Sequence, residues 1–185
     1  MNHVPNTTQH TASRLQPKTI VLTGMMAAIL AVLSQISIPL PSGVPITMQT
    51  FAVALAGFTL GAWQGSASVL IYLLLGLIGV PVFAGFSGGP GSFVGLAGGF
   101  LYGFLPMALL CGLGCHTRKP FAALIFGLFG LALCHLFGVL QFALLSGHSF
   151  GLAFLQVSVP YLGKDVLSII AAFPVSLAIR RGLQR

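Results

Sequence analysis

The segment FAALIFGLFGLALCHLFGVLQFALL, residues 121–145, runs for 25 positions without a lysine, arginine, aspartate or glutamate. About 20 mostly apolar residues are enough for an α-helix to cross the hydrocarbon core of a bilayer. The segment therefore predicts a membrane-spanning helix, and its one imidazole, His135, would lie at membrane depth.

The composition of the whole chain extends this prediction. Of its 185 residues, 56% are hydrophobic and only 5% are charged, and the mean hydropathy is +1.01. A soluble domain carries about 25% charged residues, because its surface must face water. The chain is therefore expected to be an all-α integral membrane protein whose outer surface faces lipid.

The net charge of +7 could suggest a nucleic-acid partner, but the positions of the cations argue against one. They form short clusters that border apolar segments, as the positive-inside rule describes, and no basic stripe with interleaved aromatic residues. The clusters are Arg14 with Lys18, Arg118 with Lys119, and Arg180 with Arg181 and Arg185. We expect contact with membrane lipid and none with nucleic acid.

Five further apolar segments are long enough to be membrane spans. They cover about 19–40, 46–63, 67–86, 98–115, and 160 to the C-terminal RRGLQR. The polar residues 1–17 are expected to form a short disordered tail, and 18–185 a single membrane domain of six transmembrane helices.

Six spans place both termini and the fourth-to-fifth loop on one side, together with seven of the eight cations. This distribution favours cytoplasmic termini. The opposite side then holds PSGVP, the glycine-rich residues 86–99 and the stretch 146–164, of which 151–159 is too short to span. Non-helical backbone at membrane depth is tolerated where it is buried or lines a cavity. We therefore expect an outward-facing ligand pocket roofed by loops.

Asp165 is the only acidic residue of the chain. It could be the N-cap of the last helix, an acceptor for ligand N–H groups, or both. Lys164 beside it would oppose the dipole of that helix, so it is either a solvated interface lysine or a receptor for a ligand carboxylate. The two residues together suit a ligand with an amide-like head and an acidic tail.

Three more residues are candidates for the pocket wall: Gln49, Phe83 and Tyr161. Each also has an ordinary explanation, because a helix-end glutamine and interfacial aromatic residues need no ligand. His135 is expected to be a neutral histidine bonded to a neighbouring helix.

Enzyme activity and bound cofactors are not expected. A His148–Asp165 acid–base pair is conceivable, but the sequence offers no nucleophile or second carboxylate to accompany it. Cys111 and Cys115, with His116 adjacent, lack a fourth metal ligand, so no metal site is expected. Phosphate-binding motifs of the GxxxxGK[ST] or GxGxxG type are missing from the sequence, so any ATP chemistry must come from partner proteins.

Three stretches carry a resemblance: LSQISIPLPSGVPITMQTFAVALAGFTLG (33–61), VLIYLLLGLIGVPVFAGFSGGPGSFVGLAGGFLYGF (69–104) and PYLGKDVLSIIAAFPVSLAIRRGL (160–183). They closely resemble the biotin-specific S components, the BioY family, of energy-coupling-factor transporters. The resemblance runs from the first span to the C-terminus.

This resemblance implies a six-helix protein of the prokaryotic plasma membrane that binds biotin and is not an enzyme. It implies a transmembrane T component and two ATP-binding-cassette ATPases as partners, which would use the ATP. Ala27 and Ala31 match the family's AxxxA motif for docking to the T component.

In the same family, an aspartate at the position of Asp165 contacts the ureido head of biotin. The family usually has a lysine three residues later, where this chain has Ser168, so Lys164 would have to meet the valerate carboxylate. GLAGGF at 95–100 also departs from the family, which more often has a proline–threonine pair and a tyrosine there. An S component for a different vitamin, a stand-alone facilitator and, less favoured, a small intramembrane enzyme remain alternatives.

Overall fold

The computed structural model describes residues 17–117 and 119–183. The predicted polar tail lies outside these residues except for Pro17, which begins the first helix. Of the cations named above, Arg14, Arg118 and Arg185 also lie outside them.

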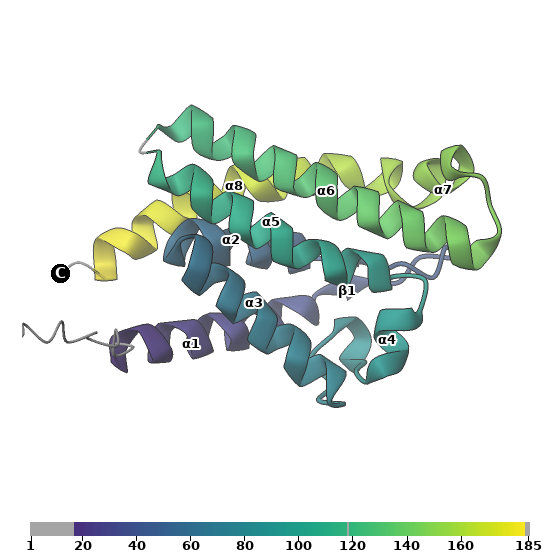
Figure 1. Cartoon of the computed structure of the whole chain (residues 1–185), viewed down its shortest axis with the longest axis horizontal. Coiled ribbons are helices and arrows are strands. Elements are labelled where there is room, and N and C mark those ends of the chain that lie inside the picture. Colours follow the sequence, from purple (N-terminus) through teal and green to yellow (C-terminus); the bar gives the residue numbers. More distant parts are fainter. Residues whose placement is uncertain (1–16, 118, 184–185) are drawn as a thin grey trace, which may run out of the picture.

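The described residues form a helical bundle with one small hairpin (Figure 1). In chain order the elements are α1 (Pro17–Ser34), β1 (Ser37–Ile38), β2 (Ile46–Thr47), α2 (Gln49–Leu60), α3 (Ala62–Leu77), the 3-10 turn η1 (Ala84–Phe86), α4 (Pro90–Val94), α5 (Gly98–His116), α6 (Pro120–Ser146), α7 (Phe150–Val157) and α8 (Val159–Leu183). β1 and β2 pair antiparallel, with Ser37 opposite Thr47.

Within the described residues, four helices are long and apolar enough to cross a membrane: α1, α5, α6 and α8. α2 and α3 are apolar but shorter, with 12 and 16 residues. Ten of the twelve residues of α2 are buried, because α1, α3, α5 and α8 all pack against it. α2 is therefore the central helix, and its sides face protein.

Several predicted span limits were wrong, and turns explain the differences. The first helix ends at Ser34, six residues early, because the chain turns into the β1–β2 hairpin. The second and third helices meet at Gly61, whose φ of 84° breaks the helix. The third helix ends at Leu77, before Gly79 at φ 101° and Pro81.

The start of α1 and the end of α8 lie at the same end of the bundle, at the left of Figure 1, together with the end of α5 and the start of α6. Lys18 Nζ donates to the carbonyl of Leu183 at 2.9 Å, which ties the start of α1 to the end of α8. Arg180 Nε donates to the carbonyl of Thr59 at 2.9 Å, in the last turn of α2. These described cations satisfy helix C-terminal carbonyls, where positive charge is favourable.

Glycines let α5 and α6 pack closely. A Cβ built on Gly103 would lie 2.6 Å from Cys134 Cα and 3.0 Å from the Cys134 carbonyl oxygen. A Cβ on Gly99 would lie 2.7 Å from the Phe137 carbonyl carbon. The backbones of the two helices therefore touch, and any side chain at these positions must push them apart.

Gly103→Ala is expected to destabilise the bundle by about 1–3 kcal/mol, because the added methyl group meets backbone that cannot yield easily. Thermal unfolding of the purified protein in detergent measures the loss. The control is Gly163→Ala in α8, where a Cβ meets open space. A Gly103→Ala protein as stable as this control would contradict the close packing.

Candidate ligand-binding site

A cavity of about 510 Å³ lies at the end of the bundle opposite Lys18 of α1 and Arg180 of α8. Ligand pockets for small molecules commonly measure about 300–1,000 Å³. Segments far apart in the sequence line the cavity: the hairpin with its loop, the start of α2, the 83–97 segment, and the first turns of α5 and α8.

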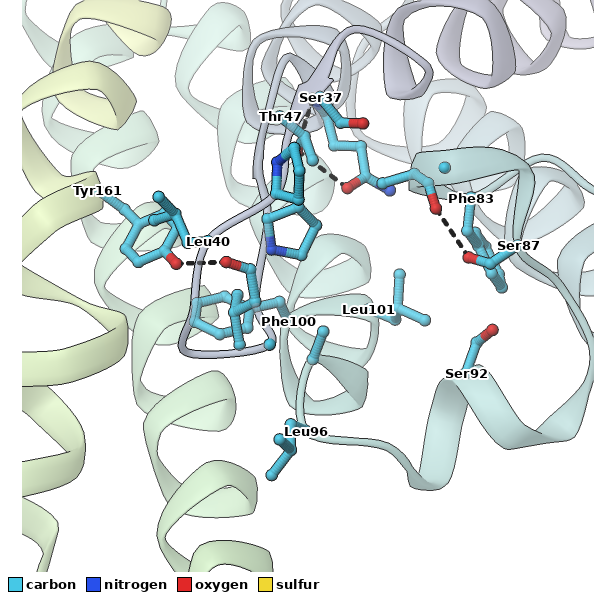
Figure 2. A pocket seen from close by; sticks show the side chains of 18 of the residues that line it. Ser37, Leu40, Thr47, Phe83, Ser87, Ser92, Leu96, Phe100, Leu101 and Tyr161 are labelled. Carbon is cyan, nitrogen blue, oxygen red and sulfur yellow. Dashed lines mark hydrogen bonds between the residues drawn. The ribbon is translucent and has the colours of Figure 1, made fainter.

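All five residues predicted from the sequence as ligand contacts line this one cavity. They are Gln49, Phe83, Tyr161, Lys164 and Asp165. Figure 2 shows Tyr161 on one side of the cavity and Phe83 on the other. The fold therefore brings these five residues to one place, although they come from three separate segments.

Asp165 is buried, with 4% of its surface exposed. Its Oδ2 lies 3.1 Å from His135 Nε2, and its Oδ1 forms an ion pair with Lys164 Nζ. Among the described residues, Oδ1 has no hydrogen bond of good geometry beyond this pair. The N-cap alternative is wrong, because α8 begins at Val159, six residues earlier.

Lys164 binds two oxygens that the fold holds in place. Its Nζ donates to the Thr47 carbonyl at 2.7 Å and pairs with Asp165 Oδ1. An ammonium has three N–H groups, so one remains for a ligand oxygen. Ser168, the position where the resemblance implied a lysine, does not line the cavity, and its hydroxyl donates to the Lys164 carbonyl at 2.9 Å.

Gln49 and Phe83 are fixed by Tyr72, a residue that the sequence did not single out. Gln49 Nε2 donates to the Tyr72 hydroxyl at 2.7 Å, and Thr47 Oγ1 donates to Gln49 Oε1 at 3.0 Å. The Phe83 ring packs edge-to-face against Tyr72, with centroids 5.3 Å apart, and against Phe93 at 5.6 Å. These contacts make Phe83 a rigid aromatic wall of the cavity, and the Gln49 amide also lines it.

The roof of the cavity is tied to the helices by side chains. The Tyr161 hydroxyl donates to the Val44 carbonyl and lies 3.2 Å from Ser42 Oγ, which fixes the hairpin loop to α8 (Figure 2). Gln141 Nε2 donates to the carbonyls of Phe93 and Gly95 at 2.7 and 2.8 Å. The sequence analysis missed Gln141, although a glutamine inside an apolar span is itself a signal.

The structure agrees with the expectation for His135 and contradicts the one for His148. His135 is bonded to a neighbouring helix, as predicted, and its partner is Asp165. The conceivable His148–Asp165 pair was wrong: His148 is exposed and stacks on Phe142, with ring centroids 6.3 Å apart. Within the described part of the chain, no group of three or more histidine, cysteine or acidic residues could hold a metal ion.

The small residues predicted for docking are not equally accessible. Ala27 is buried in the core with 2% of its surface exposed, and Ala31 is half-buried. Ala27 is therefore unavailable to a partner in this structure. The exposed small residues of α1 are Gly24 and Ala28, which also lie four positions apart.

Comparison with known proteins gives consistent matches. The BioY family model matches residues 6–185 of this chain. The biotin transporter BioY of Thermotoga maritima is 35% identical over 165 residues, covering 88% of this chain and 95% of that protein. The biotin transporter BioY of Rhodobacter capsulatus is 42% identical over 131 residues, covering 68% of this chain and 69% of that protein.

A solved structure has a similar fold. The crystal structure of the S-component for biotin from an ECF-type ABC transporter superposes with a TM-score of 0.78 at 28% sequence identity. The match covers 91% of this chain and 92% of that chain. Most of the bundle described above is therefore shared with that structure.

Tyr161→Phe is expected to loosen the roof, because it removes the hydroxyl that holds the Val44 carbonyl. Hydrogen–deuterium exchange should then rise in residues 39–45, with a stability loss of about 1 kcal/mol. The control is Tyr102→Phe, a half-exposed tyrosine of α5 that does not line the cavity. Equal exchange in both variants would mean that the Tyr161 hydroxyl does not anchor the loop.

Proposed function

This chain belongs to the BioY family, and from that membership we propose that it is the biotin-binding, substrate-specificity subunit of an ATP-driven vitamin uptake transporter of the energy-coupling-factor type. One observation supports the assignment most strongly: the only acidic side chain in the sequence, Asp165, is buried at the wall of the cavity. A carboxylate is costly to bury, so a buried one is normally paired with another group or binds a ligand. The family membership favours binding and transport over catalysis.

The ureido ring of biotin offers two N–H donors and one carbonyl acceptor. In the proposal, Asp165 accepts a ureido N–H, and the cavity's aromatic wall at Phe83 contacts the apolar body of the ligand. The sequence suggested that Lys164 meets the tail carboxylate. Its ion pair with Asp165 supports a different assignment, in which the remaining Lys164 N–H donates to the ureido carbonyl at the same end of the ligand.

Calorimetric titration of the purified protein with biotin tests this assignment. Asp165→Asn and Lys164→Ala should each weaken binding at least about tenfold, because a hydrogen bond to a charged group is worth about 1.5–3 kcal/mol. Lys119→Ala is the matched control, since Lys119 precedes α6 at the opposite end of the bundle.

Biotin methyl ester separates the two roles of Lys164. If Lys164 binds the ureido end, its substitution weakens the acid and the ester equally. If it binds the tail, the ester shows little effect of the substitution. Failure of the unsubstituted protein to bind biotin would show that the transported vitamin is a different one.

We also propose that six helices cross the membrane with both termini cytoplasmic and the cavity facing outward. Apart from Lys164, which lines the cavity, the described lysines and arginines gather at the end of the bundle that this orientation places inside, which supports it. Without a nucleotide-binding motif of its own, the chain would depend on a transmembrane T component and two ATPase subunits. Growth of a biotin auxotroph with and without the ATPases distinguishes this arrangement from a stand-alone facilitator.

Ala28→Trp is expected to block docking of the T component while leaving biotin binding unchanged, because Ala28 is exposed on α1 and does not line the cavity. Co-purification with the T component and biotin uptake are the measurements. Ala171→Trp, at an exposed small residue of α8, is the control. Normal co-purification of Ala28→Trp would exclude this face of α1 as the docking surface.

A further inference from the structure

A chain of hydrogen bonds leads from Asp165 away from the cavity into the junction between α7 and α8. Asp165 Oδ2 lies 3.1 Å from His135 Nε2, and His135 Nδ1 lies 2.9 Å from Ser158 Oγ. The exposed fractions of Asp165, His135 and Ser158 are 4%, 5% and 0%. Neither His135 nor Ser158 lines the cavity, so any effect of these two residues on a ligand is indirect.

The donors and acceptors in this chain are complementary. A carboxylate only accepts, so His135 Nε2 carries the proton that it donates to Asp165. In a neutral imidazole the other nitrogen is then an acceptor, and the Ser158 hydroxyl donates to it. In an imidazolium the Ser158 oxygen accepts instead. In both forms Asp165 Oδ2 is occupied, and Oδ1 is the oxygen left for Lys164 and a ligand.

Ser158 is itself held by backbone on both sides. Its N–H donates to the Phe154 carbonyl at 3.0 Å, which ends α7. Its carbonyl accepts from the N–H groups of Tyr161 and Leu162, each at 3.0 Å, in the first turn of α8. The backbone that carries the hydroxyl is therefore fixed, and the hydrogen bond with His135 Nδ1 orients the hydroxyl itself.

The His135 ring has a third contact besides these two hydrogen bonds. Phe100 packs edge-to-face against it, with centroids 5.7 Å apart and planes at 88°. Phe100 lines the cavity, and its ring fills the space where Gly138 has no side chain. Ser158, Phe100 and Asp165 thus restrict the imidazole from three directions.

We propose that His135 and Ser158 are positioning residues that hold the Asp165 carboxylate in the orientation in which it accepts N–H groups of the ligand. Groups locked before binding lose less conformational freedom when the ligand arrives, which increases affinity. The inference rests on the proposed function, since it assigns the residues that prepare the same binding site.

Biotin titration of the full-length chain in detergent is the first test. His135→Leu is expected to weaken binding about ten- to a hundredfold, since it removes a hydrogen bond to a charged group. His135→Gln, which keeps an N–H donor of similar reach, should recover most of this loss. Ser158→Ala should weaken binding about two- to tenfold. His148→Leu, at the exposed histidine near the roof, is the control and should bind like the unsubstituted chain.

Infrared spectroscopy separates positioning from simple packing. Asp165 is the only acidic side chain, so its carboxylate stretch is distinguished from that of the C-terminus by its loss in Asp165→Asn. His135→Leu and Ser158→Ala should shift this band, and His135→Gln should restore it. The band can be measured in His135→Gln and Ser158→Ala even if His135→Leu does not fold.

Two results would overturn the inference: binding by His135→Leu at the unsubstituted affinity, or a carboxylate band that none of these substitutions shifts. Failure of the unsubstituted chain to bind biotin is a separate result. It would contradict the proposed ligand, while the infrared data would still decide whether His135 and Ser158 orient Asp165.

Discussion

The ion pair and hydrogen bond around Asp165 connect the parts of the molecule that form the cavity. Burying a charge costs several kcal/mol unless partners replace the lost water. Here the partners come from two other segments besides α8: His135 from α6 bonds Oδ2, and Thr47 from β2 holds the Lys164 ammonium that pairs with Oδ1. Satisfying one carboxylate therefore requires α6, α8 and the hairpin to meet at one place.

The packing of the helices makes this meeting possible. α2 carries Gln49 at one end and the Thr59 carbonyl that receives Arg180 at the other, so it separates the cavity from the cationic end. The α5–α6 contact brings two backbones together at Gly99 and Gly103. Between lipid-facing helices, such close contact supplies the attraction that the hydrophobic effect supplies in water. The packed apolar helices thus hold the polar groups in position, and these polar groups are concentrated where the segments cross.

The sequence was sufficient for the order of the apolar segments, and charge is so scarce that Asp165 and Lys164 stand out as candidates. It did not single out Tyr72 or Gln141, whose side chains hold the surroundings of the cavity in place. It was not sufficient for the helix ends, which depend on Gly61 and the hairpin. The sequence also did not show which face of α1 is buried. A helix that is apolar on every side has no polar stripe to mark its exposed face, so Ala27 and Ala28 look alike until packing distinguishes them. The His135–Asp165 pair joins residues 30 positions apart, which only tertiary structure can show.

A binding subunit that is to release its ligand must be able to lose the contacts that hold it. The geometry around Asp165 suits this requirement, because its partners belong to segments that are not continuous with one another. Ser158 lies where α7 ends and α8 begins, and Tyr161 links the first turn of α8 to the hairpin loop. Displacement of α8 relative to α6 or the hairpin would change the bonds of the carboxylate and the roof together. Movement of whole helices would therefore alter the affinity for the ligand by changing the hydrogen bonds of Asp165.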